Sequence, residues 1–162
     1  MKKTTQRARR KFSGGCSCGQ VRYQLLDKPI RVHCCHCTDC QRHTGSAFVL
    51  NAIIETSAIK ILRGKLQAFP VRRADGAHDI YRCPKCKVAL WSDYGQRPHI
   101  RFVRVGTLDN PSAIRPDIHI YTETKVPWLK LPKGIPAFRR YYSLKRVWTE
   151  HAQQRLKLAL GR

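Results

Sequence analysis

The sequence predicts a mainly β fold, with antiparallel sheets stabilised by zinc and one amphipathic helix at the C-terminal end. Three observations predict this class. Short segments rich in β-branched and aromatic residues recur along the chain, turn residues separate them, and cysteines stand in close pairs beside several of these turns. The length of 162 residues suggests a single domain with a modest core.

The strand pattern is clearest at 20–26, where Val21, Tyr23 and Leu25 alternate with polar residues and are expected to point inward. The segments "SAFVLNAII" and "AIKIL" are apolar, rich in β-branched residues and too short for good helices. Further strands are expected in "HDIYRC", "VALWS", "IRFVRVG" and "DIHIY". Glycine, proline, asparagine and aspartate separate these segments, which favours an antiparallel arrangement over alternating strands and helices.

The segment "SLKRVWTEHAQQRLKLAL" has the periodicity of one basic amphipathic helix, which Ser143 could cap and Gly161 could end. Its apolar face is expected to pack on the domain body or on a second copy of the chain, as a homodimer. A membrane-surface or nucleic-acid role is the alternative. The apolar face consists of Leu144, Val147, Trp148, Ala152, Leu156, Ala159 and Leu160.

We therefore expect three parts: a basic, flexible N-terminus at 1–11, a zinc-binding domain at 12–138, and a basic C-terminal helix and tail at 139–162. The chain has 32 Lys and Arg against 10 Asp and Glu, a formal net charge of +22. These basic residues are spread along the whole chain. They predict weak, salt-sensitive association with polyanions, and dedicated nucleic-acid binding is the sharper alternative.

The expected location is cytoplasmic. No window approaches the ~18 apolar residues of a membrane span, and the basic start lacks the apolar stretch of a secretory signal. Eight cysteines could form disulfides or bind metal, and disulfides are rare in the cytoplasm. The pairs Cys16-x-Cys18 and Cys34–Cys35 are also awkward for unstrained disulfide geometry. The cysteines therefore predict metal sites.

The first predicted site joins Cys16-x-Cys18 to Cys83-Pro-Lys-Cys86. Two short pairs far apart in sequence can close one tetrahedral four-thiolate zinc site. Such a site has no open coordination position, so its expected role is structural. Lys87 stands where a zinc turn of this type often has glycine.

The second predicted site is Cys35-x-Cys37-x-x-Cys40. Three ligands from one loop are the usual protein contribution to a catalytic zinc with one open position. Three thiolates make this zinc a weak Lewis acid but suit it to a fourth sulfur, so an open site indicates a thiol substrate. The alternative is a closed site, in which the fourth ligand is a remote residue or one of Cys34, His33 and His43.

Five blocks carry a resemblance to a known family: "GGCSCGQVRYQL", "CHCTDCQRHTGSAF", "RCPKC", "RVGTLD" and "PDIHIYTETKVPW". In order and spacing they resemble the glutathione-dependent formaldehyde-activating enzyme family, also named for the centromere protein V domain that it shares. The blocks cover about residues 13–138. The resemblance implies coiled antiparallel sheets, a structural zinc at the four-cysteine site and a second zinc at Cys35, Cys37 and Cys40.

The same resemblance implies carbon–sulfur chemistry of the lyase type, in which formaldehyde and glutathione form S-hydroxymethylglutathione. Arg42, which follows Gln41, could pair with a carboxylate of glutathione, and a solvated surface arginine is the alternative. His119, Lys125 and Trp128 form a late block that could line the substrate cleft, with core packing of Trp128 as the alternative. The competing function is a non-catalytic, zinc-stabilised binding module whose basic surface contacts nucleic acid.

Overall fold

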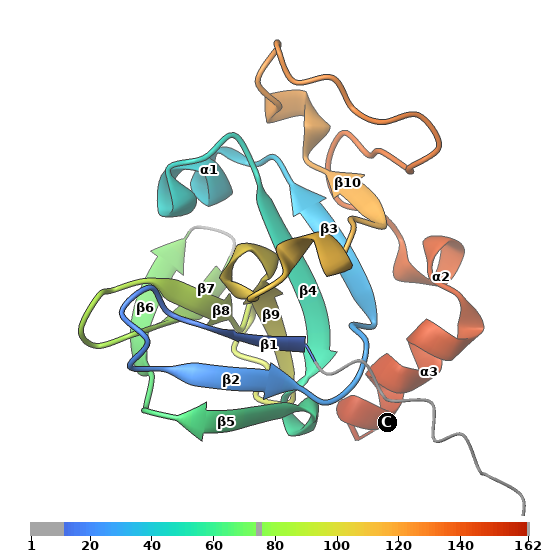
Figure 1. Cartoon of the computed structure of the whole chain (residues 1–162). Helices are drawn as coiled ribbons and strands as arrows, with labels where there is room; N and C mark the ends of the chain where they lie inside the picture. The colour runs from blue at the N-terminus through green and yellow to red at the C-terminus, as the bar shows by residue number, and fades with distance from the viewer. Residues whose placement is uncertain (1–11, 74–75, 162) are drawn as a thin grey trace, which may run out of the picture.

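The computed structural model describes residues 12–73 and 76–161, so the predicted flexible N-terminus lies outside the described residues. Two sheets dominate, which confirms the mainly β class (Figure 1). The smaller sheet has the order β1-β2-β5, with β1 (Phe12–Gly15), β2 (Arg22–Leu25) and β5 (Ile59–Arg63). The larger sheet has the order β10-β3-β4-β9-β8-β7-β6 and contains β3 (Arg31–Cys35), β4 (Val49–Glu55), β6 (Gln67–Arg73), β7 (Gly76–Arg82), β8 (Ala89–Ser92), β9 (Ile100–Arg104) and β10 (Ile118–Ile120).

Helices are short and lie between or after the strands. The α-helices of the described residues are α1 (Thr38–Thr44), α2 (Leu144–Val147) and α3 (Glu150–Ala159). Single 3-10 turns occur at η1 (Thr56–Ala58), η2 (Val105–Thr107), η3 (Pro111–Ala113) and η4 (Thr122–Thr124). The sequence patterns did not indicate α1, which begins at the second predicted metal site.

The pairing of β10 with β3 is parallel, whereas the other strand pairs are antiparallel. The predicted antiparallel sheets thus contain one parallel pair, at this edge. A parallel pair needs a long connection, and the chain between β3 and β10 runs through most of the domain before it returns (Figure 1). This return places His119 beside the cysteine-rich segment.

The predicted inward face is confirmed, since Val21, which directly precedes β2, and Tyr23 and Leu25 within it are fully buried. They belong to a core cluster, with Ala52, Val103 and others, between the two sheets. Strand β6 was not expected from the sequence. It contains Pro70, which the sheet tolerates because β6 is an edge strand and proline cannot donate a hydrogen bond.

The C-terminal segment packs on the domain itself. Trp148 and Ala152 are buried in a second core cluster, which they share with Ile53 and Phe102 of the larger sheet and with Ile118 of β10. The seven-stranded sheet is thus covered by the small sheet on one face and by α2 and α3 on the other (Figure 1). The predicted apolar face therefore docks within the chain.

The tail forms two helices instead of the single one predicted. Trp148 has an extended backbone, and Thr149 starts a new helix because its side chain accepts a hydrogen bond from Ala152 N at 3.3 Å. The side chain of Ser143 makes no capping hydrogen bond, and Gly161, at φ +68°, follows the end of α3. The N-cap signal of Thr149 is stronger than the continuous apolar periodicity, so the helix breaks there.

An ion pair fixes α3 against the larger sheet. Arg155 donates from Nε to Glu55 Oε1 at 2.8 Å, and its terminal nitrogen lies 2.7 Å from Glu55 Oε2.

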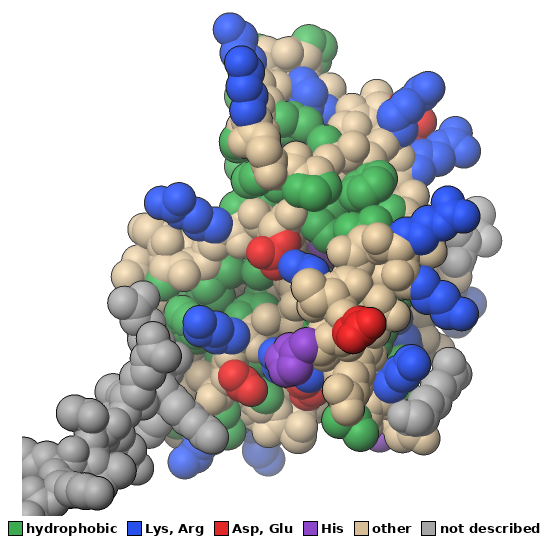
Figure 2. Space-filling model, turned by 90° about the vertical axis from the view of Figure 1, so that its right-hand side faces the viewer, with side chains coloured by type: hydrophobic (Ala, Val, Ile, Leu, Met, Phe, Trp, Pro, Cys, Tyr) green, Lys and Arg blue, Asp and Glu red, His purple; other side chains and the backbone are tan. Residues whose placement is uncertain are grey.

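Lys and Arg side chains are otherwise scattered over this side of the molecule (Figure 2). Within the described residues, no helix combines the length and apolar character needed to cross a membrane.

Candidate metal centres

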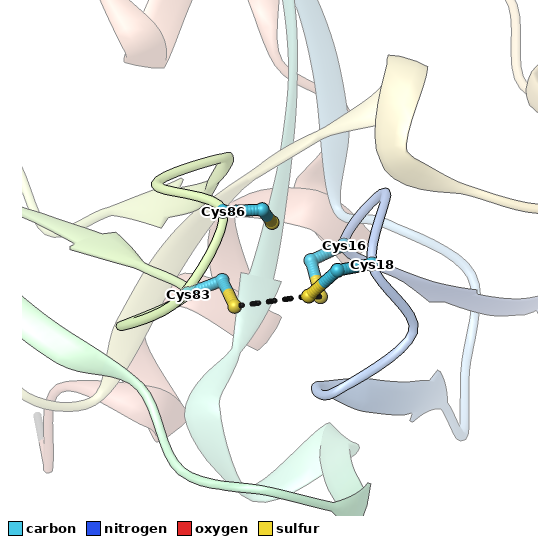
Figure 3. Close-up of side chains that lie close together, drawn as sticks. All are labelled: Cys16, Cys18, Cys83 and Cys86. Carbon is cyan, nitrogen blue, oxygen red and sulfur yellow. Dashed lines mark hydrogen bonds between the residues drawn. The ribbon is translucent and has the colours of Figure 1, made fainter.

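The four cysteines of the first predicted site meet between two loops (Figure 3). Their sulfur atoms all lie within 4.8 Å of one another, with Cys16 Sγ 3.5 Å from Cys18 Sγ and Cys18 Sγ 3.7 Å from Cys83 Sγ. A tetrahedral ion with Zn–S bonds of ~2.3 Å separates its sulfur ligands by about 3.8 Å. The fourth member is Cys86, and none of the four cysteines forms a disulfide. The cluster therefore has the donor set and spacing of a metal site.

Backbone groups stabilise negative charge on these sulfurs. Val21 N donates to Cys16 Sγ at 3.2 Å. Hydrogen bonding from the backbone of Val88, and then of Cys18, lowers the pKa of the Cys86 thiol to about 6. Thiolates are the form that binds metal, so these donors suit an ion. The sequence predicted this four-cysteine grouping in full.

Lys87 takes the left-handed conformation, with φ of 63°. Its backbone N–H donates to Cys83 O at 3.0 Å, which closes the turn that presents Cys83 and Cys86. Only glycine adopts this region without steric cost. The structure thus explains why glycine would be expected at this position and what lysine must do there.

The second cysteine group lies at the junction of β3 and α1. Cys35 is the last residue of β3, Cys37 is the N-cap of α1, and Cys40 lies in its first turn. Their sulfur atoms are all within 4.8 Å of one another, and Cys37 Sγ also accepts a hydrogen bond from Cys40 N at 3.4 Å. The tight N-terminus of a helix therefore gathers three ligands that are close in sequence.

No fourth histidine, cysteine or carboxylate among the described residues joins this group within 4.8 Å of every sulfur, so Cys34, His33 and His43 are outside it. The neighbouring Cys37 and then Cys40 thiols raise the pKa of Cys35 far above its ordinary value. Three crowded thiols resist ionisation when no cation compensates their charge. A bound divalent cation would supply that charge, and the three-sulfur donor set fits zinc.

The three sulfurs border a cavity of about 370 Å³. Its walls come from β3, α1, β4, β7, the loop between β8 and β9, β9, the end of β10 and the start of α2 with the segment before it. This volume lies within the range of small-molecule sites. The polar and aromatic side chains in the wall include His33, His78, Tyr94, Arg97 and Tyr121.

Tyr94 and a buried arginine lie behind the three cysteines, and the sequence did not indicate either. Tyr94 Oη is 3.7 Å from Cys40 Sγ, and its ring packs against His78 with centroids 4.6 Å apart. Burial raises the pKa of Tyr94, and the positive charge of Arg104 opposes that shift. Arg104 donates to Asn51 Oδ1 and, at 3.0 Å, to Ser92 Oγ. A buried cation thus lies near a site that thiolates would make negative.

The four predicted substrate residues do not line this cavity in the described part of the chain. The Arg42 side chain is 80% exposed, 3.9 Å from Asp39, and Trp128 is 73% exposed, so Trp128 does not pack in the core. Lys125 Nζ donates to two backbone carbonyls of its own loop. His119 is buried on the face of β10 that points away from this cavity. Their roles toward a substrate stay predictions.

A larger cavity of about 490 Å³ lies elsewhere, between Phe48, Arg82, Val88 and Pro111. None of the described residues that line it is a cysteine. We assign the chemistry to the smaller cavity because it contains the three thiols, a neutral buried imidazole and a tyrosine hydroxyl. The imidazole is that of His33, whose pKa burial lowers to about 4.

Comparisons with known proteins gave one structural match and one sequence match, and only the sequence match bears on the family. A crystal structure of a Rhodobacter sphaeroides protein aligns with a TM-score of 0.47 and 21% sequence identity, over 64% of this chain and 91% of the other. A sequence profile described as "Glutathione-dependent formaldehyde-activating enzyme" matches residues 11–124, more than half of the chain. That span contains both cysteine groups, Tyr94, Arg97 and Arg104. This protein therefore belongs to the glutathione-dependent formaldehyde-activating enzyme family.

Proposed function

We propose that the protein is a zinc-dependent enzyme of carbon–sulfur lyase type that acts on the adduct of glutathione and an aldehyde, with S-hydroxymethylglutathione as the reference substrate. The observation that carries this proposal is the group of three cysteine sulfurs at the wall of a small-molecule cavity, with no fourth protein ligand among the described residues. Zinc, held there by Cys35, Cys37 and Cys40, would bind the glutathione sulfur as a thiolate.

The side chains of the cavity suit the rest of the substrate. Among the described lining residues Arg97 is the only lysine or arginine, and it could bind a carboxylate of glutathione. Its Nε donates to Tyr94 O at 2.8 Å and its guanidinium lies over the Phe102 ring, which fix its position. We therefore assign to Arg97 the role that the sequence suggested for Arg42.

In the forward direction the thiolate sulfur forms a bond to the aldehyde carbon. The π electrons of the carbonyl move to oxygen, and that oxygen gains a proton equivalent to the one the thiol lost, so no oxidant or reductant is required. Tyr94 Oη could donate a hydrogen bond to the oxygen as its negative charge develops. Cleavage of the adduct follows the same path in reverse.

Exchange NMR of glutathione, formaldehyde and S-hydroxymethylglutathione at equilibrium tests the proposal. The zinc-loaded protein should raise the exchange rate above the spontaneous rate, and the rate should increase with protein concentration. Arg97→Gln should raise the KM for glutathione about tenfold, whereas Arg42→Gln, an exposed arginine, serves as the matched control. An exchange rate equal to the spontaneous one at full zinc loading would exclude this activity.

The second candidate function is a zinc-stabilised binding module for nucleic acid. Its support is the net charge of +22 and the scattered Lys and Arg of Figure 2. The cavity with its three thiols favours the enzyme, because a polyanion binds to surface charge and does not require a small-molecule cavity. All eight cysteines lie among the described residues and none forms a disulfide, which suits a reducing compartment such as the cytoplasm, the location we propose. Homodimer formation stays a prediction.

A further inference from the structure

A third group of metal-ligand side chains lies on the opposite face of β3 from the three-sulfur site. Successive residues of a strand point to opposite faces. Cys35 and His33 therefore face the cavity, while Cys34 faces away from it. The parallel register pairs Cys34 with His119 of β10, which places these two side chains side by side on that face. His36, two residues after Cys34, returns to the same face.

The three side chains converge on a common point. Cys34 Sγ is 3.5 Å from His36 Nε2, which is 3.0 Å from His119 Nδ1, and one ligand atom of each lies within 4.8 Å of the other two. Bond lengths of ~2.0 Å to nitrogen and ~2.3 Å to sulfur in a tetrahedral site give separations of about 3.3 Å between nitrogens and about 3.5 Å between nitrogen and sulfur. The observed separations are within a few tenths of an ångström of these values.

A simple hydrogen bond between the two rings explains this arrangement less well. His36 and His119 are 0% and 4% exposed. Their outer nitrogens, His36 Nδ1 and His119 Nε2, have no hydrogen-bond partner among the described residues. A lone ring-to-ring hydrogen bond would use one proton and would compete with the Cys34 contact at the same nitrogen. A cation would instead engage both inner nitrogens and the sulfur together.

The ligands are held in position before any ion binds. The backbone carbonyl of His36 accepts hydrogen bonds from Gln41 Nε2 at 2.7 Å and from Thr124 Oγ1 at 3.0 Å. The backbone of His119 is hydrogen-bonded on both sides to the segment 136–138. These bonds fix the backbone of both histidines, although the outer nitrogens of their rings have no partner of their own among the described residues. The backbone therefore presents both rings at this point before any ion binds.

We propose that Cys34, His36 and His119 form a third metal site, separate from the two cysteine sites and independent of the proposed enzyme activity. One thiolate and two neutral imidazoles suit a borderline transition-metal ion, and zinc is the expected occupant. With one thiolate, the ion would keep a net positive charge. Strand β3 would thus carry ligands of two metal ions, Cys35 on one face and Cys34 on the other.

The test is metal stoichiometry and cadmium-113 NMR on the full chain, reconstituted without oxygen. Zinc reconstitution should give three ions per chain. The cadmium form should give three resonances, of which the one at lowest frequency belongs to the site with a single sulfur. That resonance and one ion should be lost in both Cys34→Ala and His119→Gln, but kept in His151→Gln, a change at an exposed histidine of α3.

Two ions per chain and no single-sulfur resonance in the parent protein would overturn the proposal, even if neither variant folded. A third ion that persists in both Cys34→Ala and His119→Gln would overturn it as well. Elemental analysis of protein purified directly from cells distinguishes zinc from copper, which the same donor set can bind. Either metal in this site supports the proposal, and copper would correct its expected occupant.

Discussion

At the residue scale, several side chains take positions that their neighbours in sequence do not explain. Lys87 adopts the left-handed conformation in the turn that presents Cys83 and Cys86. Its ammonium group lies 5.7 Å from the centre of the Phe69 ring, a contact that offsets part of the strain. The conformation is required by the turn, because the Lys87 N–H must reach Cys83 O.

We expect Lys87→Gly to be more stable than Lys87→Ala by about 1 kcal/mol, because alanine keeps the steric cost of the left-handed region and glycine does not. Both variants lack the contact with Phe69, so the difference between their free energies of unfolding reports the cost of the backbone conformation alone. Chemical denaturation measures it. The same pair at Lys85, whose φ is not positive, should show the opposite order. Equal stability at Lys87 would show that the turn imposes no strain.

Tyr94 is the second residue whose role depends on its position, 3.7 Å from Cys40 Sγ in the cavity wall. If its hydroxyl donates to the developing alkoxide, Tyr94→Phe should reduce kcat about 10²-fold and leave zinc content unchanged. Tyr81→Phe is the matched control, because Tyr81 is not among the residues that line the cavity. A Tyr94→Phe variant with normal kcat would remove Tyr94 from the mechanism.

At the scale of elements, the two cysteine groups differ in what they connect. The four-cysteine group ties the loop after β1 to the turn between β7 and β8, with a sequence separation of 65 between Cys18 and Cys83. The three-cysteine group joins the end of β3 to the α1 that follows directly. Metal binding should therefore stabilise the fold at the first group much more than at the second.

Cys83→Ser should lose one zinc and unfold or aggregate, because structural zinc contributes ~10 kcal/mol or more and whole domains are stable by ~5–15 kcal/mol. Cys37→Ser should remain folded, since serine is also a good N-cap for α1, but lose one zinc and the glutathione-dependent exchange. Zinc content and thermal melting of both variants beside the parent decide this. Unfolding of Cys37→Ser with tolerance of Cys83→Ser would reverse the two roles.

At the scale of the whole molecule, the dominant property is charge. The net charge of +22 is not gathered on one element, and Arg104 is a buried cation that adds little to the charge of the surface. A dispersed positive field attracts polyanions without a shaped interface. The charge therefore affects association with polyanions more than the chemistry of the cavity.

Binding to duplex DNA should weaken steeply with salt, by about 0.9 logarithmic units per contacted phosphate for each tenfold rise in salt concentration. Fluorescence anisotropy from low to high salt measures this slope, with random and mixed sequences giving the same affinity. The glutathione-dependent exchange rate, measured over the same salt range, should change little. Sequence-selective DNA binding that persists at high salt would favour the binding module instead.

The sequence by itself determined the β class, the inward face of β2 and the two cysteine groups. These features depend on local signals: the two-residue period of strands, the short spacing of ligands and the turns beside them. It could not place the residues that complete the cavity. Tyr94 and Arg97 come from a segment without a motif. Arg104, which lies near this cavity without lining it, begins the block "RVGTLD", but only the pairing of β4, β8 and β9 brings it to Asn51 and Ser92.

The tertiary structure also decided what the sequence left open in the stretch from His33 to Cys40. Alternation along β3 separates Cys34 from Cys35, and the parallel return of β10 brings His119 to Cys34. The same return depends on a long connection whose path no local pattern records. The sequence thus determined which residues can bind metal, and long-range strand pairing decided which of them meet.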